Sequence, residues 1–509
     1  MNFLYFLLGL LPIIWLILAL IVLKMPTYKA AMGSLLVAIV LAFTIWKMPM
    51  INIVTATIEG FANAIWPIIL VIVAAMFTYN LTLKTGAMEV IKQMLSSMTN
   101  DKRILVLILA WCFGGFMEGM AGFGTAIAIP AGMLYAMGFN PIFSCLVCLI
   151  ANGVPTPFGS IGIPTVTLAN LIGLENTTLS FYTAIQLAPF IMLCPILIVI
   201  ATGKGFKALK GVWIPTLASG LSFFIPMIIV GNFVGAELAV VVGSVCSLLV
   251  TILLGSKVKP NPEYQMDLPK NENKLDVKSC LVAWSPFIFI FVFLLLTSKL
   301  IAPINSALSQ FSSSVQFYSG DNPNTLTFAW INTPGVWIFL SAFIGGKIQK
   351  ATWNDFKVVF ISTLKQMKAT MITMCSVLGC AKVMGYAGMI ASIANFAISI
   401  TGPFYPLVAP WIGALGCFVT GSGTSSGVFF GAVQASAAQA LNANTYWIVA
   451  LNSMGVAAGK MMSPQSIAIA LSSVKKEGED AKLLGKILPY GLLFLIIMSI
   501  YAFVGAKLL

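Results

Sequence analysis

The chain has 509 residues, of which 59% are hydrophobic and only 8% are charged, and its mean hydropathy is +0.99. A soluble protein of this length would carry far more polar surface, so the composition predicts an integral membrane protein. The net charge of +13 does not indicate a nucleic-acid-binding protein, because the lysines are scattered through short loops. Such scattering is typical of the excess of cations in cytoplasmic loops of membrane proteins.

Apolar runs long enough to cross a hydrocarbon layer of about 30 Å as helices recur from end to end. We expect about 12 to 14 crossings and some shorter segments. The runs are continuous rather than alternating, which argues against a transmembrane barrel. The first run, residues 3–23, has no basic residue before it and no small-residue cleavage site after it, so we expect a retained helix and not a signal peptide.

The distribution of cations predicts the orientation of the chain in the membrane. Lysine and arginine gather in four segments that we expect to be cytoplasmic, namely 24–29, 84–103, 204–210 and 347–357. We expect the polar stretch 255–279 to be cytoplasmic as well. Its composition predicts a flexible linker between two halves. The stretch 304–334 carries a single charge, Asp321, and is expected outside. This order places the N-terminus outside.

The two halves resemble each other at an offset of about 300 residues, as in many secondary transporters. "GFGT" at 122–125 corresponds to "GSGT" at 421–424, and Asn152, Gly159 and Pro164 correspond to Asn452, Gly459 and Pro464. The charge pattern reverses between the copies: 84–103 is basic whereas 383–459 has no charge, and 171–183 is nearly uncharged whereas 471–486 is rich in lysine. We therefore expect two repeats of inverted topology that share a site near the membrane midplane.

The expected fold is an all-α polytopic membrane protein with re-entrant or broken segments. Its expected parts are N-terminal scaffold helices (1–46), a first repeat with broken helices (47–170), scaffold helices (171–254), a cytoplasmic linker (255–279), a helix with an extracellular loop (280–346), a second, inverted repeat (347–470), and a C-terminal cytoplasmic segment with the last helix (471–509).

Each half contains two glycine- and proline-rich breaks, at 119–125 and 152–165 in the first half and at 420–427 and 452–466 in the second. Unwound backbone at membrane depth is tolerated only where protein or water covers it. The helix N-termini exposed there suit a small carboxylate, and hydroxyl groups add donors. The candidate substrate-binding residues are Gly122, Gly124, Thr125, Thr156, Ser160, Thr165, Gly423, Thr424, Ser425, Ser426, Lys460, Ser463 and Gln465, with Asn152, Asn452 and Lys382 as secondary candidates.

These glycines have two other interpretations. Close helix packing through small residues fits Gly115 and Gly119, which stand four residues apart. A phosphate-binding loop at 421–427 is not supported, because no Gly-Lys-Ser/Thr follows it and Lys460 lacks the hydroxyl residue after it.

Charged residues inside apolar runs narrow the choice of site residues further. Each charge raises the free energy of membrane insertion by about 2.5 to 3.5 kcal/mol at the centre of a span. Glu118 and Lys460 lie beside or inside breaks. We expect Glu118 to carry a proton and Lys460 to offset the desolvation of a substrate carboxylate. The alternatives are snorkelling to an interface or a buried Glu–Lys pair that joins the halves. The remaining charges in apolar runs, Glu59, Glu237 and Lys299, are expected near the interfaces.

No enzyme constellation is present in the sequence. The chain has no histidine, which excludes a Ser-His-Asp triad and most metal sites. Cys145 and Cys148 stand at helical spacing and are expected to pack rather than to bind metal. We therefore expect no enzymatic activity, no cofactor and no metal.

Three stretches carry a family resemblance: "GGFMEGMAGFGTAIAIPAGML" (114–134), "NGVPTPFGSIGIPT" (152–165) and "GSGTSSGVFFGAVQ" (421–434). They closely resemble the bacterial L-lactate permease family, and the resemblance covers essentially the whole chain. It implies uptake of L-lactate, often with D-lactate and glycolate, by proton symport across the bacterial plasma membrane. It also implies, by analogy only, an architecture like that of dicarboxylate carriers, whose paired re-entrant hairpins move against a scaffold.

The leading hypothesis is thus a carrier that moves lactate with H+. A sodium-coupled carrier of a related acid is the alternative within transport, and a channel or a sensor for such anions is the alternative outside it. The expected partners are the monocarboxylate, H+ and the lipid bilayer, and a homodimer was also considered.

Overall fold

The computed structural model describes residues 3–122, 124–203, 205–259, 261–266, 276–321, 323 and 325–508. Residues 260 and 267–275 of the predicted linker lie outside the described residues, as do Phe123 in the first break, Lys204 in a cationic loop, and Asn322 and Asn324 in the 304–334 stretch.

The first half begins with α1 (Phe3–Ile21) and α2 (Thr27–Thr44). A single span of 35 residues follows, Met50–Lys84, made of α3 (Met50–Asn63), η1 (Ala64–Ile69) and α4 (Leu70–Lys84). The next elements are α5 (Ala87–Ser96), α6 (Lys102–Val106), η2 (Leu107–Phe113), α7 (Gly114–Met120), α8 (Thr125–Ala136), α9 (Pro141–Gly153), η3 (Thr156–Phe158), α10 (Gly159–Ile172) and α11 (Asn176–Thr202). Then come η4 (Phe206–Leu209), α12 (Trp213–Phe233), α13 (Ala236–Gly255) and η5 (Pro262–Tyr264).

The second half follows a similar order. It consists of α14 (Val277–Thr297), α15 (Ala302–Ser309), strands β1 (Ser312–Gln316) and β2 (Thr325–Ala329), α16 (Pro334–Ile348), α17 (Trp353–Ala387), α18 (Met389–Thr401), η6 (Gly402–Phe404), α19 (Tyr405–Thr420), α20 (Gly423–Ala440), α21 (Thr445–Met462), α22 (Pro464–Ser473) and α23 (Asp480–Leu508). The helix α17 has 35 residues and so matches the long span of the first half.

The prediction of a mostly helical, multi-span membrane protein is confirmed. Within the described ranges, 11 helices are long and apolar enough to cross a membrane, or 12 if the bent pair α9 and η3–α10 counts as one span. Two further apolar helices, α8 and α16, are too short for this criterion. The strands were not expected: β1 and β2 pair antiparallel, with Ser312 opposite Ala329. Their Thr, Val and Phe residues favour extended structure.

The two long spans run antiparallel to each other. Lys84 at the end of the first span lies 4.0 Å from Asp355 at the start of α17. Asn80 donates to Thr363 at 3.0 Å, and Glu59 near the start of the first span pairs with Lys382 near the end of α17. The short helices after them, α5 and α18, both begin after a glycine in the left-handed region. The predicted inverted repeat requires such an antiparallel pair, and the repeat itself stays a prediction.

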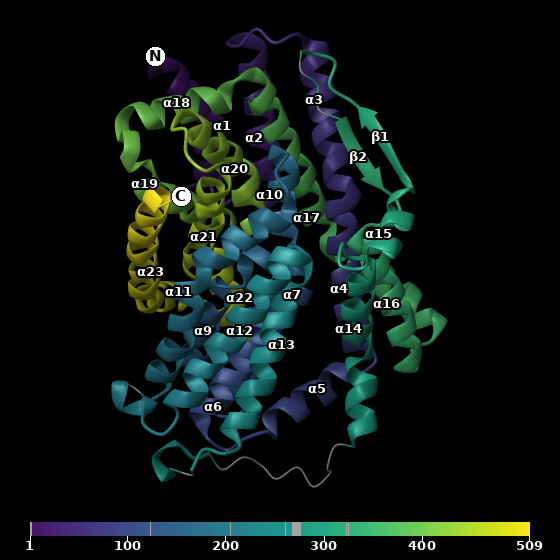
Figure 1. The fold of residues 1–509 in the computed structure, drawn as a ribbon, viewed down its shortest axis with the longest axis vertical. Helices are drawn as coiled ribbons and strands as arrows, with labels where there is room; N and C mark the ends of the chain where they lie inside the picture. The colour runs from purple at the N-terminus through teal and green to yellow at the C-terminus, as the bar shows by residue number, and fades with distance from the viewer. Residues whose placement is uncertain are drawn as a thin grey trace.

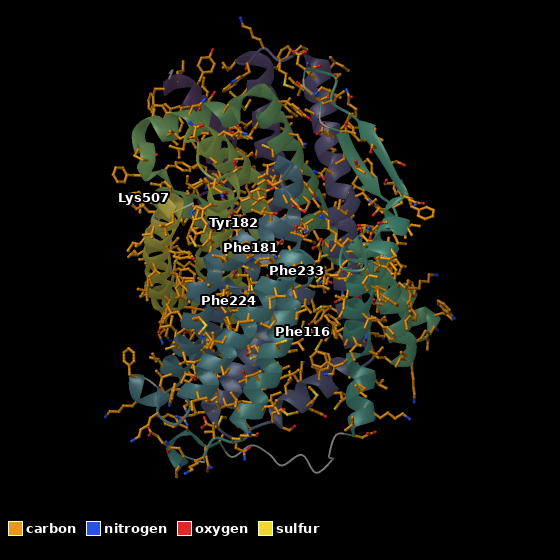
Figure 2. All side chains as sticks on the ribbon, in the orientation of Figure 1. Phe116, Phe181, Tyr182, Phe224, Phe233 and Lys507 are labelled. Atoms are coloured by element: carbon orange, nitrogen blue, oxygen red, sulfur yellow. The ribbon has the colours of Figure 1, made fainter. Side chains whose placement is uncertain are left out.

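The helices form two groups that flank the centre of the molecule (Figure 1). One group holds α1–α4 and α14–α17, in which α17 packs on α2 and α3 and α16 packs on α4. The other group holds α6–α13 and α19–α23, in which α12 packs on α13 and α19 packs on α21. Side chains fill the space between elements (Figure 2), and Phe116 of α7 contacts the ring of Trp284 on α14 with a centroid distance of 5.0 Å.

Candidate functional site

Both halves contain a helical hairpin whose tip turns on a left-handed glycine. In the first hairpin α7 ends at Met120, and Gly122 (φ 61°) and Gly124 (φ 88°) precede α8. In the second, α19 ends at Thr420 and Gly421 (φ 66°) precedes α20. Glycine takes this conformation without the steric cost that a side chain would meet. The two breaks predicted at 119–125 and 420–427 are therefore turns between half-helices.

Each hairpin tip also lies against the broken helix of its own half. A Cβ atom on Gly122 would collide with Oγ of Ser160, and one on Gly421 would collide with Oε1 of Gln465. A second contact repeats in both halves. Ser160 Oγ donates to the carbonyl of Ala121 at 2.8 Å, and Lys460 Nζ donates to the carbonyl of Gly421 at 2.7 Å. The two donors stand 300 positions apart, but Ser160 follows the break in its helix whereas Lys460 precedes the break at Ser463.

The broken helix of the first half departs from regular geometry at the predicted place, whereas in the second half α21 continues to Met462 and the chain breaks only at Ser463. Between α9 and α10 the chain forms a 3-10 turn and bends by 61°. At the start of α10, Ser160 and Ile161 have φ values of 47° and 58°. Non-glycine residues in this region carry about 1 to 2 kcal/mol of steric cost each. Such strain persists where the surrounding structure imposes it, often at functional sites.

A cavity of about 370 Å³ lies against the second tip and the broken helix of the first half, with Glu118 of α7 in its wall. Its size is in the range of small-molecule sites. Eight of the residues predicted for the site line it: Glu118, Thr156, Ser160, Gly423, Thr424, Ser425, Lys460 and Gln465. The structure thus brings together candidates from both halves, which the sequence alone places about 300 residues apart.

Glu118 is the carboxylate of this cavity. Its side chain is only 4% exposed, and its Oε2 accepts a hydrogen bond of 2.7 Å from Asn152 Nδ2. A Cβ atom on Gly159 would come within 2.5 Å of Glu118 Oε1, so the glycine leaves room for the carboxylate. Asn152 does not line the cavity, and it acts as an orienting neighbour of Glu118.

The N-terminus of α20 supplies donors on the opposite wall. Ser422 caps this helix by accepting from the amide of Ser425 at 3.2 Å. The amides of Gly423 and Thr424 precede the first intrahelical bonds, and both residues line the cavity. Ser425 Oγ is buried and has no hydrogen-bond partner among the described residues. These groups and the positive end of the helix dipole suit an anion.

Several predicted residues have structural contacts and do not line the cavity. Thr125 Oγ1 donates to the Gly122 carbonyl, Thr165 Oγ1 to the Pro157 carbonyl and Ser426 Oγ to the Gly413 carbonyl, at 2.7, 2.7 and 2.8 Å. Gly122 and Gly124 shape the tip. Ser463 and Asn452 are fully buried, and their side chains have no partner in the described part of the chain.

Lys382 is not at the cavity. It forms a buried ion pair of 2.6 Å with Glu59, whose side chain is 1% exposed, and the position of Glu59 near an interface stays a prediction. The cause of the pairing is the close approach of α3 and α17, where Gly60 lies against Gly379. The Tyr386 hydroxyl also donates to Glu59, at 3.0 Å. The alternative interpretation, a buried Glu–Lys ion pair that joins the two halves, therefore applies to Lys382.

The other two charges in apolar runs lie near a smaller cavity of about 200 Å³ that both residues line. Glu237 accepts from Asn176 at 3.0 Å and is half-buried. Lys299 is exposed and pairs with Glu175 at 3.0 Å.

Sequence reasoning missed one wall of the main cavity. Pro26, Thr27 and Tyr28, from the start of α2, line it together with Met367, Ala369, Thr370, Thr373 and Met374 of α17. These segments contain no break and no charge that faces the cavity, so no local pattern marked them. One available signal was the group of polar residues in the middle of the apolar helix α17.

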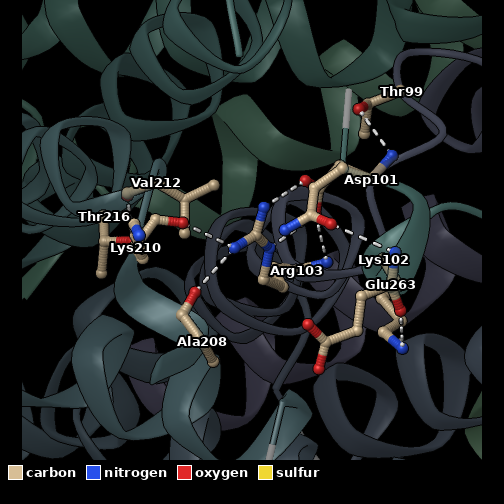
Figure 3. Close-up of polar contacts among 10 residues, drawn as sticks. Thr99, Asp101, Lys102, Arg103, Ala208, Lys210, Val212, Thr216 and Glu263 are labelled. Atoms are coloured by element: carbon tan, nitrogen blue, oxygen red, sulfur yellow. Dashed lines mark hydrogen bonds and ion pairs between the residues drawn. The ribbon is translucent and has the colours of Figure 1, made fainter. Parts of the chain in front are cut away.

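Arg103, in the cationic segment 84–103, has a structural role. Its guanidinium is 1% exposed and forms a two-point contact with Asp101, at 2.7 and 3.0 Å (Figure 3). It also donates to the carbonyls of Ala208 and Lys210 at 2.8 and 3.0 Å, and it lies 4.0 Å from the ring of Tyr264. Arg103 thereby ties three loops together.

The packing interpretation is confirmed for Gly115 and Gly119. Gly115 faces Phe223 of α12, and Gly119 faces Val240 and Val241 of α13. Cys145 and Cys148 are buried, and Cys145 Sγ donates to the carbonyl of Ala470. Within the described ranges no group of three or more His, Cys, Asp or Glu side chains could hold a metal ion.

The fold and the site define a multi-span helical membrane protein with a polar cavity that is lined by the hairpin tip of the second half and the broken helix of the first. Proteins of this class are commonly carriers of small solutes. The model of the L-lactate permease family matches residues 5–509, and the chain belongs to this family.

Individual relatives agree with this assignment. The chain is 44% identical to an L-lactate permease of Streptococcus iniae over 87% of this chain and 93% of the relative. It is 31% identical to the L-lactate permease and 30% identical to the glycolate permease GlcA of Escherichia coli K12, each over 98% of this chain and 95% of the relative. Among solved structures, the match to the Alcanivorax borkumensis YdaH transporter covers 88% of this chain and 86% of the transporter's chain. Its TM-score is 0.47 and the sequence identity is 16%.

Proposed function

We propose that this protein is a secondary active transporter that imports L-lactate together with a proton across the bacterial plasma membrane. The assignment to lactate rests on the family and on the relative that is 44% identical. The observation that carries the mechanism is that Glu118 and Lys460, one from each half, line the same cavity.

The chemistry of the cavity fits a small hydroxy-monocarboxylate. Lys460 and the free amides at the start of α20 offer positive potential for the carboxylate. The hydroxyls of Thr156 and Ser425 and the amide of Gln465 offer partners for the substrate hydroxyl. A monoanion that moves with one proton carries no net charge, and Glu118 is the acid in the cavity wall that can bind that proton.

Transport requires that the cavity open alternately to the two sides. Its walls come from both groups of helices, because α17 and the start of α2 line it together with the second hairpin tip and the broken helix of the first half. A movement of the hairpin group against the group of α1–α4 and α14–α17 would change access to the cavity without unfolding either tip. Such movement of one bundle around a central site is typical of carriers built from inverted repeats.

The substrate range extends in this proposal to D-lactate and glycolate. A relative that is 30% identical is named a glycolate permease, which supports the smaller acid. The cavity of about 370 Å³ places no steric barrier against either compound.

Sodium coupling is the second candidate for the driving ion. The left-handed turn at Ser160–Gly162 turns backbone carbonyls away from helical bonding, and such carbonyls ligate Na+ in other carriers. The two candidates make opposite predictions for uptake at fixed pH.

The test is uptake of radiolabelled lactate into proteoliposomes that contain the purified protein. We expect accumulation when the outside is more acidic, with no requirement for Na+. Glycolate and D-lactate should compete, and dicarboxylates should not. If uptake at constant pH required Na+, the coupling ion would be sodium and not the proton. The absence of any lactate counterflow would overturn the transport assignment. Single-channel currents would instead indicate a channel.

A further inference from the structure

A second cavity lies on the side of the molecule that is expected to be outside. It has a volume of about 200 Å³, and Asn305 and Asn332, from the stretch 304–334, line it together with residues at the starts of α11 and α13. The main cavity reaches the opposite side, because Pro26 and Tyr28 belong to a segment that is expected to be cytoplasmic. In the predicted orientation the two cavities therefore face opposite sides of the membrane, and we refer to the smaller one as the outer cavity.

One turn of backbone lies between the two cavities. Its first residue, Gly159, lines the main cavity, and a Cβ atom there would come within 2.5 Å of Glu118 Oε1. Its last residue, Gly162 (φ 73°), contacts the start of α13, where a Cβ atom would come within 2.7 Å of the amide nitrogen of Glu237. Glu237 lines the outer cavity. The turn 159–162 therefore touches two carboxylate-bearing residues, one of each cavity.

The two carboxylates are oriented in the same way. Asn152 Nδ2 donates to Glu118 at 2.7 Å, and Asn176 Nδ2 donates to both oxygens of Glu237, at 3.0 and 3.1 Å. Neither carboxylate forms an ion pair in the described part of the chain. An amide donor still finds an acceptor oxygen when the carboxyl group is protonated. Both residues can therefore gain and lose a proton without losing the contact that positions them.

The charge of the outer cavity favours a proton over an organic anion. Lys299 also lines this cavity, but it pairs with Glu175 at 3.0 Å, so its positive charge is already balanced. An ionised Glu237 leaves the outer cavity negative, and a negative group repels lactate. Glu237 is only half-buried, so water in the cavity can reach it. The elements packed against α13 carry the charged side chains Glu118 of α7, Lys278 at the far end of α14, and Lys102 and Arg103 of α6, which lies at the far end of α13.

We propose that Glu237 accepts the transported proton from outside and passes it to Glu118. This inference rests on the proposed proton-coupled transport and adds an outer step to it. A hydronium ion in the outer cavity protonates the carboxylate of Glu237. Glu237 then releases that proton to water along the turn 159–162, the carboxylate of Glu118 takes it up, and Glu237 is ionised again. Water is needed because a direct hydrogen bond joins atoms about 2.6 to 3.2 Å apart, and the turn lies between the two residues.

The experiment compares wild type with Glu237→Gln in proteoliposomes that contain the purified protein. The first assay measures lactate uptake driven by an acidic outside, together with proton entry reported by a pH-sensitive dye inside the vesicles. The second assay measures lactate counterflow at equal pH on both sides. Glu237→Gln keeps an oxygen for the amide of Asn176 but cannot carry a proton, whereas Glu237→Asp retains a carboxylate. The matched control is Asp321→Asn, which removes an exposed carboxylate of the stretch 304–334 that does not line the outer cavity.

We expect Glu237→Gln to slow gradient-driven uptake and the accompanying proton entry several-fold and to leave counterflow at the wild-type rate. Glu237→Asp should recover most of the uptake, and Asp321→Asn should match wild type in both assays. Wild-type uptake and proton entry in Glu237→Gln would overturn the role of Glu237 and leave the proposed transport intact. An equal loss of uptake and counterflow in Glu237→Gln would also overturn it, because counterflow needs no net movement of protons. If wild type shows no counterflow, or takes up lactate only with Na+, the proposed function fails first.

Discussion

At the scale of single residues, the main cavity depends on a few polar contacts in an apolar interior. Glu118 is held by Asn152, and Lys460 is held by the Gly421 carbonyl, so both charges have partners before a substrate arrives. A buried charge without a partner would be strongly unfavourable. These partners explain how two charges persist at the centre of the molecule.

The first prediction concerns proton coupling. Glu118→Gln keeps the shape and an acceptor oxygen for Asn152 but cannot bind and release a proton. We expect loss of uptake driven by a pH gradient, while lactate counterflow, which needs no net proton movement, continues. Both assays use the same proteoliposomes. If Glu118→Gln accumulated lactate like wild type, its coupling role would be wrong.

The second prediction concerns Arg103. Arg103→Ala leaves Asp101 and the carbonyls of Ala208 and Lys210 without their donor. Breaking such a buried pair costs about 3 to 5 kcal/mol. We expect a lower Tm of the purified protein in detergent and unchanged KM for lactate in the fraction that folds. Lys207→Ala, an exposed cation of the same loop region, should leave Tm unchanged.

At the scale of elements, the hairpin tips are the features that the sequence marked best. Glycine is needed there for two separate reasons, the left-handed backbone and the lack of room for a side chain. The chain allows these reasons to be separated, because Gly478 is also left-handed (φ 91°) but has no atom within 4 Å of the site of a Cβ.

The third prediction uses this contrast. Gly421→Ala should reduce lactate transport severely, because its methyl group collides with Gln465 in addition to the cost of the backbone. Gly478→Ala carries only the backbone cost, about 1 kcal/mol or slightly more, and should retain transport. Initial rates of counterflow, normalised to folded protein, distinguish the two. Similar losses in both variants would argue against a tight tip at Gly421.

A contact between loops leads to a fourth prediction, on pH. The ion pair of Lys299 and Glu175 joins the loop before α11 to the loop after α14, and the hydrogen bond from Lys299 lowers the pKa of Glu175 below its ordinary value. A carboxyl with a lowered pKa in the folded state adds stability above its unfolded pKa and loses it as pH falls. Both side chains are largely exposed, so we expect less than about 1 kcal/mol.

The measurement is the Tm of wild type and of Lys299→Gln from about pH 6 to about pH 3, a range that includes the ordinary pKa of glutamate near 4.3. The difference between the two proteins should be present at pH 6 and vanish at the acid end. The exchange variant E175K/K299E should restore the wild-type Tm at pH 6. A difference that grows toward low pH would contradict this assignment.

At the scale of the whole molecule, the order of elements fits repeats that are longer than the predicted boundaries 47–170 and 347–470. The pair α1 and α2 precedes one long span, as α14 and α16 precede the other, and the long helices α11 and α23 close both series. On this basis we propose repeats that run from α1 to α11 and from α14 to α23, with α12 and α13 as an added pair.

The fifth prediction tests the orientation of the repeats. On a cysteine-free background, a cell-impermeant maleimide should label Ser313→Cys in intact cells, since its loop is expected outside. Lys207→Cys should react only after the membrane is opened. Labelling of both positions, or of Lys207→Cys alone, in intact cells would overturn the predicted orientation.

The sequence by itself determined the class of the molecule, its family and most residues of the tips. Composition and long apolar runs leave only a helical bundle, because lipid does not hydrogen-bond to backbone groups. Glycine, proline and charge in apolar runs are unfavourable there, so their presence marked Glu118, Lys460 and the breaks. These signals are local and can be seen in one stretch of chain.

Only the tertiary structure decided which of these residues meet. In the tertiary structure Glu118 and Lys460 line one cavity, whereas Lys382 pairs with Glu59. The partner of a charge depends on which helices pack side by side. The tertiary structure also added the start of α2 and α17 as a wall, which the sequence marks only by the polar residues in the middle of α17. Side-chain direction and helix packing arise from contacts between segments far apart in the chain, and no spacing within one segment records them.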